Sequence, residues 1–362
     1  MGIATLVLAV VASGCAPSYS GTPQEQIDQI VRFVESSRGH AFVTTPTVTF
    51  ESDSLFRQGI LDQLAAAKPS VDAAEPTFKA LGWISSGASL WAKYQIMFGG
   101  AVVGYYDPAS KVLKVRGTGL TPYRREVIAH ELTHALDDQL FGLDDDFGDG
   151  LLGQATFSAL VAIEGDAART QQRYVNAMSA IDRAQDTAEQ LTIGTDPALL
   201  TVPIELLTFT QAPYTQGPKF VSSVAAAGGN AAVDGIFSRY PATAEQAFDT
   251  SKYLTNDPAV AVPAPPADGP IVASGGLGQF LLSEIIRQGA ALDVDPVTRG
   301  WAGDAYVSWG SGASSCLRLD TRMDTQAQAD ALRSSLSNWA SSHPHAVVAP
   351  EAPATVRLTS CA

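Results

Sequence analysis

Residues 127–138 constrain the fold more than any other part of the chain, because they include two histidines four residues apart. On an α-helix, His130 and His134 lie on one face, with their Cβ atoms about 5–6 Å apart. Neutral imidazoles at this spacing converge on one zinc ion, and Glu131 then lies beside the coordination position that water occupies. We therefore expect this segment to be a helix.

The residues around the motif favour a helix as well. Thr121 and Pro122 supply an N-cap and a proline in the first turn. Apolar residues recur at helical spacing and predict a buried stripe. They are Val127, Ile128, Leu132, Leu136 and Leu140. The short motif also occurs in helices that bind no metal, so the interpretation depends on a third ligand.

A third ligand is expected downstream, since a catalytic zinc ion usually has three protein ligands and one exchangeable water. Glu164 lies in an otherwise apolar, helix-forming run over residues 157–169. A carboxylate there is costly to bury unless it is paired or bound to a metal ion. We expect His130, His134 and Glu164 to hold one Zn²⁺; the alternative is a surface glutamate before a Gly-Asp break.

The sequence HELTHALDD, followed by a glutamate thirty residues after the second histidine (164 − 134 = 30), resembles the gluzincin class of zinc metallopeptidases. Within that class it is similar to a family of bacterial and archaeal secreted or lipid-anchored HExxH proteins. The similarity covers about residues 100–310. The further matching segments are residues 104–108, 163–167, 213–214, Gly217, 220–221, 244–246, 252–253, 277–282 and 300–304.

This resemblance implies a zincin-like α+β fold. A small mixed sheet with a hairpin would pack on the helix with the HExxH motif, and a largely helical C-terminal part would follow. In gluzincins an edge strand pairs with the extended substrate. We assign this role to residues 101–106; the alternative is a hairpin without substrate contact.

The chain departs from the thermolysin-like pattern at one position. Those gluzincins have an aspartate four residues after the glutamate ligand, whereas this chain has Ala168. Such an outer carboxylate orients a ligand histidine. We expect Asp138 or Asp166 to take this role.

The implied activity is zinc-dependent hydrolysis of peptide bonds at the cell envelope. Zinc would polarise the scissile carbonyl, and Glu131 would take a proton from the zinc-bound water and deliver it to the leaving amine. The alternative is a non-catalytic zinc-binding envelope lipoprotein that acts as a binding or scaffolding module.

The tetrahedral intermediate of such a reaction needs a second stabiliser besides the metal ion. Tyr214, in a Pro-Tyr segment similar to the family, is our first candidate. Tyr174, His343 and His345 are alternatives, and a packing role for Tyr214 stays open. His40, His343 and His345 are expected to take no part in metal binding.

The net charge of the chain limits the kinds of partner that it can bind by electrostatic attraction. The chain has 23 basic and 37 acidic residues, a net charge of −14, which argues against electrostatic binding to nucleic acid or to an anionic membrane surface. With 46% hydrophobic and 17% charged residues, the chain is expected to be globular. A peptide or protein substrate remains the expected partner.

The N-terminus predicts export. Residues 3–12 form an apolar run that is too short to span a bilayer, and small residues precede Cys15. This pattern resembles a lipobox, so we expect a signal peptide over residues 1–14, a lipid anchor on Cys15 at the outer face of the cytoplasmic membrane, and a tether over residues 15–22. The alternative is a simple cleaved signal.

The remaining residues, 23–362, are expected to form one domain with a C-terminal subdomain at about residues 271–362. Apart from Cys15, the chain has two cysteines, Cys316 and Cys361. In an exported protein they are expected to form a disulfide that stabilises the fold by about 2–4 kcal/mol. The alternative is a pair of buried free thiols.

Periodicity and capping patterns predict the remaining elements. Helices are expected over residues 22–34, 55–64, 75–81, 151–191, 277–288 and 325–339, and strands over 45–50, 101–106, 111–115, 301–309 and 355–358. Helices over residues 203–253 should break at Gly228-Gly229 and at Pro241, and residues 256–270 should form a surface loop.

Overall fold

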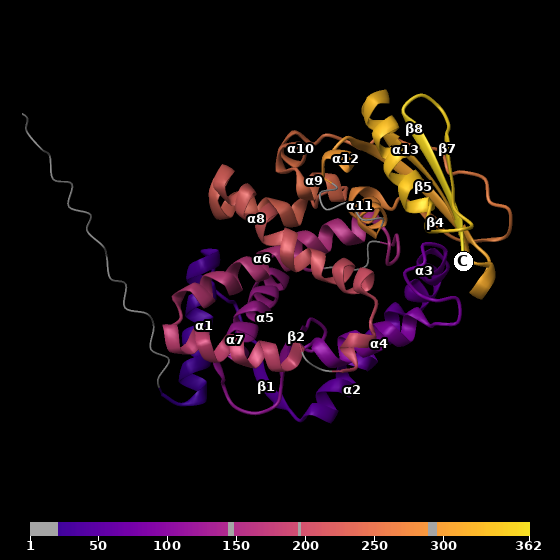
Figure 1. The fold of residues 1–362 in the computed structure, drawn as a ribbon. Helices are drawn as coiled ribbons and strands as arrows, with labels where there is room; N and C mark the ends of the chain where they lie inside the picture. Colours follow the sequence, from indigo (N-terminus) through magenta and orange to yellow (C-terminus); the bar gives the residue numbers. More distant parts are fainter. Residues whose placement is uncertain (1–20, 144–147, 195–196, 289–294) are drawn as a thin grey trace, which may run out of the picture.

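The structure is a computed structural model that describes residues 21–143, 148–194, 197–288 and 295–362. It has the mixed α+β composition that the sequence predicts, with two separate sheets and many helices (Figure 1). The predicted signal peptide, Cys15 and most of the tether lie outside the described residues.

The described residues from 21 to 141 contain five α-helices and a small sheet. In order these elements are α1 (Pro23–Arg38), β1 (Thr47–Glu51), α2 (Asp53–Leu64), α3 (Lys68–Ala80), α4 (Leu90–Ala101), β2 (Gly104–Asp107), β3 (Val112–Arg116) and α5 (Pro122–Phe141). The strand order is β1-β3-β2, with β1 parallel and β2 antiparallel to β3. The expected small mixed sheet with a hairpin is therefore present, and it packs on α5 through a shared apolar core.

The expected strand over residues 101–106 begins later than predicted. Helix α4 extends to Ala101, and the strand starts at Gly104. Ser89 caps this helix by accepting a hydrogen bond from the amide of Ala92. A short apolar run fits a buried helix or a strand equally well, so periodicity could not place this boundary.

Helices dominate the middle of the chain. They are α6 (Gln154–Ala177), α7 (Ala180–Gly194), α8 (Ile204–Ser238), α9 (Ala244–Phe248) and α10 (Thr250–Thr255). The predicted break in α8 is confirmed, because Gly228 and Gly229 have non-helical backbone angles there. By length and composition α8 would suit a membrane span, but its inner face packs along α6.

The end of the chain is less helical than the sequence indicated. Residues 271–361 contain β4 (Ile271–Gly275), α11 (Gly278–Gln288), α12 (Asp295–Thr298), β5 (Trp301–Trp309), β6 (Cys316–Met323), α13 (Gln326–Ala340), β7 (Val347–Pro350) and β8 (Thr355–Cys361). The strands form one antiparallel sheet in the order β4-β5-β6-β8-β7. The expectation of a largely helical C-terminal part is therefore wrong for these residues.

Strand β6 shows why this sheet was hard to predict. Nearly all its side chains are buried, including polar ones, so alternation between apolar and polar residues is absent. Asp320 is buried because it faces Arg357 on β8, whose guanidinium donates to both carboxylate oxygens at 2.7 and 2.6 Å.

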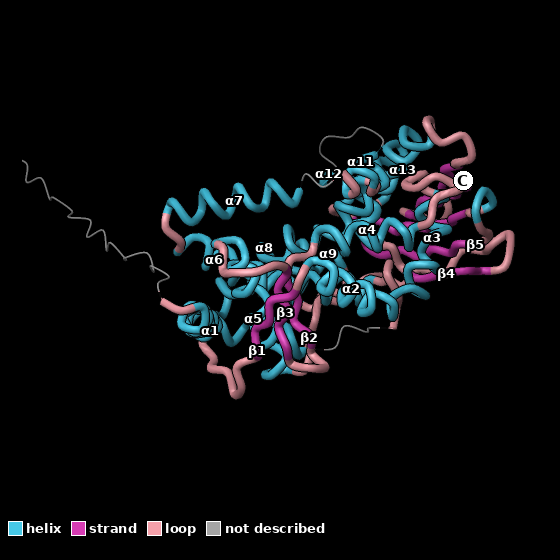
Figure 2. Tube along the Cα trace, turned by 90° about the horizontal axis from the view of Figure 1, so that it is seen from below, coloured by secondary structure: helices cyan, strands magenta, loops and turns pink. Residues whose placement is uncertain are grey.

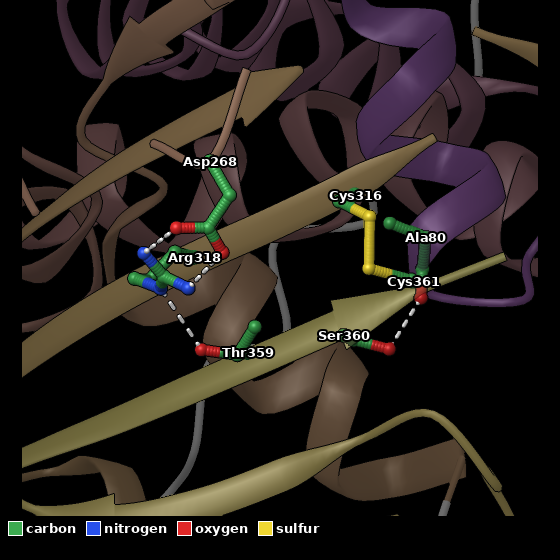
Figure 3. The surroundings of a disulfide bond; sticks show 7 residues. All are labelled: Ala80, Asp268, Cys316, Arg318, Thr359, Ser360 and Cys361. Atoms are coloured by element: carbon green, nitrogen blue, oxygen red, sulfur yellow. Dashed lines mark hydrogen bonds and ion pairs between the residues drawn. A yellow bond between two sulfur atoms is a disulfide. The ribbon is translucent and has the colours of Figure 1, made fainter. Parts of the chain in front are cut away.

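The predicted disulfide is confirmed. Cys316 and Cys361 are directly opposed on β6 and β8 and are bonded to each other (Figure 3). The neighbouring Ser360 hydroxyl donates to the carbonyl of Ala80 at 2.6 Å, which ties β8 to the end of α3. The larger apolar core joins this sheet to α3, α4, α8 and α11, and the two sheets lie well apart (Figure 2).

Candidate metal centre

Helix α5 places the HExxH motif in the middle of a capped helix. The Thr121 hydroxyl accepts from the amide of Arg124 at 3.3 Å, and the helix ends at Gly142, whose φ of 68° is left-handed. Three of the predicted apolar positions, Ile128, Leu132 and Leu136, are fully buried. Leu140 differs from the expectation, because 36% of its surface is exposed.

Glu164 lies in the middle of α6, where two glycines allow an unusually close helix contact. A Cβ atom added to Gly165 would lie 2.5 Å from the carbonyl carbon of Gly217 on α8, so the two backbones touch. Only glycine permits this approach. The contact fixes Glu164 on α6 relative to Tyr214, three residues before Gly217.

The structure brings the three predicted ligands together. The Nε2 atom of His130 lies 3.1 Å from Oε2 of Glu164 and 3.0 Å from Nε2 of His134. The third separation, from Nε2 of His134 to Oε2 of Glu164, is 3.3 Å. Of the described residues, this is the one group of histidine, cysteine and acidic side chains whose ligand atoms suit a metal ion.

His134 and Glu164 shift each other's pKa. Burial alone would lower the pKa of His134, but Glu164 outweighs that effect and raises the pKa to about 9. Burial alone would raise the pKa of Glu164, and the two histidines instead hold it well below its usual range. A proton and a metal ion compete for the same nitrogen of His134, so metal binding here must depend on pH.

Gln171 orients His130. Its side-chain oxygen lies 2.9 Å from Nδ1 of His130, and its amide nitrogen donates to Glu126 at 3.3 Å. The oxygen of Gln171 can only accept, so Nδ1 of His130 carries the proton and Nε2 keeps its lone pair for a metal ion. Gln190 donates to Glu126 at 2.9 Å and helps to hold this arrangement.

Sequence reasoning did not identify Gln171. The available signal was its position seven residues after Glu164, which puts both residues on the same face of α6. A glutamine on a helix is ordinarily a surface residue, so this spacing alone carried little information.

Asp166, one of the two expected outer carboxylates, contacts an arginine instead of a histidine. Its carboxylate lies 2.7 Å from Nε of Arg38, a fully buried guanidinium that also contacts Asp137 at 2.8 Å and Asp234 at 3.1 Å. Burial alone would lower the pKa of Arg38, but the three aspartates raise it above its usual value. We call Arg38, Asp137, Asp166 and Asp234 the Arg38 cluster; it joins α1, α5, α6 and α8.

Asp138, the other expected outer carboxylate, is connected to Glu131 through Tyr106. It accepts from the hydroxyl of Tyr106 at 2.8 Å and from the ammonium of Lys111 at 2.6 Å. The backbone amide of Tyr106 in turn donates to Oε2 of Glu131 at 2.9 Å. Strand β2 can lie this close to α5 because residue 104 is a glycine: a Cβ atom there would lie 2.5 Å from a methyl carbon of Val127 on α5.

Glu131 is suited to accept a proton. It is 9% exposed, and burial raises its pKa from the usual value despite the opposing effect of the two histidines. A carboxylate with a raised pKa is a better general base near neutral pH.

Tyr214 lies at the centre, as the sequence led us to expect. Its ring stacks on His130 with 5.9 Å between centroids and 24° between planes. Although 41% of the residue is exposed, burial of its hydroxyl and the neighbouring Glu164 and Glu131 raise its pKa well above the usual value. The hydroxyl therefore keeps its proton and can donate a hydrogen bond; a hydrogen bond to Glu164 is one cause of the raised pKa.

The alternative candidates for the oxyanion stabiliser, and the histidines expected to bind no metal, lie elsewhere. Tyr174 is fully buried against Phe33 in the core behind α5. His343 stacks on Trp339 at the end of α13, and His345 is exposed in the loop that follows. His40 pairs with Asp234 at 2.8 Å, at the edge of the Arg38 cluster.

Comparison with known proteins gives no relative. No family model, no curated protein and no solved structure matches the chain.

Proposed function

We propose that the chain is a zinc metallopeptidase of the gluzincin type, which hydrolyses peptide bonds outside the cytoplasm. The observation that carries this proposal is the triangle of donor atoms on His130, His134 and Glu164, with sides of 3.0, 3.1 and 3.3 Å. Donors of a tetrahedral zinc site with bonds of about 2.0–2.2 Å lie about 3.3–3.6 Å apart. The triangle is thus within a few tenths of an ångström of zinc geometry, and two imidazoles with one carboxylate are a zinc ligand set.

Zinc in this site would polarise the scissile carbonyl and acidify the attacking water. The residues of the chain supply the remaining steps. Glu131, held by the amide of Tyr106, accepts a proton from the attacking water and returns it to the leaving amine. Tyr214 donates a hydrogen bond to the oxyanion, which its protonated hydroxyl can do without a change of ionisation.

The edge strand β2 is the proposed site for the substrate backbone. It is one of the two outer strands of its sheet, and its Tyr106 amide donates to Glu131, so this strand lies beside the proposed metal ligands. An extended peptide that adds to this edge would be held close to Glu131 by main-chain hydrogen bonds. The acidic surface implied by the net charge of −14 favours neutral or basic peptides.

The decisive variant is Glu131→Gln, which removes the base but none of the three metal ligands. We expect it to bind one zinc ion and to cleave a mixed peptide library about 10²–10⁴-fold more slowly than the wild type. Equal cleavage rates would refute the mechanism. A wild-type protein that holds zinc but shows no cleavage with or without a chelator would support a zinc-binding scaffolding lipoprotein.

Export and anchoring are part of the same proposal. The Cys316–Cys361 disulfide is typical of proteins in oxidising compartments and supports a location outside the cytoplasm. A lipid on Cys15 would hold the protein at the outer face of the cytoplasmic membrane. Fractionation of cells that express Cys15→Ser tests this, since the variant should leave the membrane fraction.

A further inference from the structure

A hollow of about 460 Å³ lies between α6 and α8, away from the groups that the proposed reaction uses. Its size falls within the range of about 300–1,000 Å³ that is usual for small-molecule sites. The residues that line it are Arg169, Gln172, Arg173, Pro218, Ser222, Ala225 and Ala226. The lining thus has two arginines and no acidic side chain, in a chain whose net charge is −14.

Arg169 is poorly compensated for a buried charge. It is 8% exposed, and its Nη1 atom has no hydrogen-bond partner among the described residues. Its nearest ion-pair partner among the described residues is Oδ1 of Asp166, 3.8 Å from Nη1 and too far for a hydrogen bond, while Oδ2 of the same carboxylate lies 2.7 Å from Nε of Arg38. Buried charges are normally paired and hydrogen-bonded, since desolvation is costly.

Arg173 adds a second positive charge one turn further along α6. Like charges at this spacing repel each other, and the pKa of Arg169 is lowered by burial and then by Arg173. Arg173 donates from Nη1 to the carbonyl and hydroxyl oxygens of Ser37, at 3.2 and 3.1 Å, which carry no full negative charge. An anion between the two guanidinium groups would remove the repulsion and supply the missing acceptors.

The hollow and the metal centre lie on different sides of α6. Arg169 and Arg173 come five and nine residues after Glu164, which places them about 140° and 180° around the helix from it. A ligand in the hollow is therefore separate from the peptide that would lie over the metal ion.

We propose that Arg169 and Arg173 form an anion-binding site for a small molecule that carries a phosphate or carboxylate group. Guanidinium groups bind both oxyanions through paired hydrogen bonds. Ser222 and Gln172 line the same hollow with neutral polar groups, and Pro218, Ala225 and Ala226 give it an apolar wall for the rest of the molecule.

The test is calorimetric titration of the full-length protein at constant ionic strength with inorganic phosphate, glycerol phosphate or acetate. We expect saturable binding of at least one of these probes, and the preferred probe identifies the anionic group. Arg169→Gln and Arg173→Gln should each weaken this binding about tenfold or more, because each removes a charge-assisted hydrogen bond. Arg333→Gln, on the exposed face of α13, is the matched control and should bind as the wild type does.

A second kind of variant tests the binding site even if the arginine variants fail to fold. Ser222 is exposed on α8 and lines the hollow, so Ser222→Glu would place a carboxylate beside the two arginines. It should abolish binding of the probes and raise the thermal unfolding midpoint in their absence. The proposal is overturned if no probe binds saturably, or if binding survives unchanged in Ser222→Glu and in the folded arginine variants.

Discussion

Helices α5 and α6 hold two buried charged clusters that differ in the origin of their positive charge. In the Arg38 cluster, three aspartates surround a guanidinium that belongs to the chain itself. In the candidate metal centre, Glu164 faces two histidines whose charge would depend on bound protons or on a metal ion. The positive charge of the first cluster is permanent, whereas that of the second can be exchanged.

This difference indicates that the two clusters have different roles. Asp137 lies three residues after His134 on α5, and Asp166 lies two residues after Glu164 on α6. Because Arg38 contacts both aspartates, the Arg38 cluster fixes α5 and α6 against each other. The proposed metal centre could then bind and release ions or protons without reorganisation of the helices. Variants that break one cluster should therefore have effects unlike those of variants that break the other.

The largest loss of stability is expected from Arg38→Met. It leaves three aspartates without their shared counter-charge, and breaking a buried ion pair in this way costs about 3–5 kcal/mol. Chemical denaturation measures the free energy of unfolding. Arg32→Met, at an exposed position on the same helix, is the control and should change stability by less than about 0.5 kcal/mol. An equal effect of both variants would contradict the role of the cluster.

Glu164→Ala should instead affect metal affinity and leave the fold intact. Removal of a direct ligand should weaken zinc binding by more than the roughly 10–100-fold that loss of an outer partner costs. Elemental analysis after dialysis measures occupancy, and circular dichroism verifies folding. Full zinc occupancy in the dialysed variant would show that Glu164 is not a ligand.

Gly165→Ala tests the contact between α6 and α8 that positions both Glu164 and Tyr214. The added methyl group must displace the backbone of Gly217, and such overpacking costs about 1–3 kcal/mol. Gly235→Ala on α8 is a matched control, because a Cβ atom there meets no other atom within 4 Å. The prediction fails if the two alanine variants unfold at the same denaturant concentration.

Gln171→Ala should weaken zinc binding by about 10–100-fold, since His130 loses the acceptor that fixes its ring and tautomer. The neighbouring Gln172 bonds only Asn176 in the described structure, so Gln172→Ala controls for helix propensity. A competitive zinc indicator measures both affinities. Indistinguishable values would remove Gln171 from the centre.

The last effect concerns pH in metal-free protein. The pKa of His134 is raised from its unfolded value to about 9, so the stability that it contributes is complete below about pH 6.5 and is lost as the pH rises through about 9. The lowered pKa of Glu164 adds stability that is present above about pH 4.5 and is lost in acid. Thermal melts of chelator-treated protein should therefore show higher stability at pH 6 than at pH 9.5. His134→Gln should reduce this difference, and the part that remains includes the buried Glu126, whose pKa is raised to about 8.

The parts of the molecule that were predictable depend on local patterns. The cap at Thr121, the helical spacing of the histidines and the break at Gly228 and Gly229 involve neighbouring residues. Pairing of Cys316 with Cys361 followed from their being the two cysteines left after Cys15.

The parts that were missed depend on distant residues. Arg38 meets Asp137 across 99 positions and Asp234 across 196, and nothing in its local sequence marks it as buried. Asp166 and Asp138 were expected to orient a ligand histidine, but the partners described above are Arg38 on α1 for Asp166 and Tyr106 on β2 for Asp138. Strand β6 escaped recognition because its polar residues are buried by pairing across the sheet.

The position of β8 has a consequence for biosynthesis. This strand, residues 355–361, is inserted between β6 and β7 in the finished sheet. A nascent chain that stops before residue 355 leaves the edges of both neighbours unpaired, and open edges of this kind recruit other chains. The sheet can close only after residue 361 has left the ribosome and reached Cys316, so prematurely terminated products should be prone to aggregation and open to quality-control proteases.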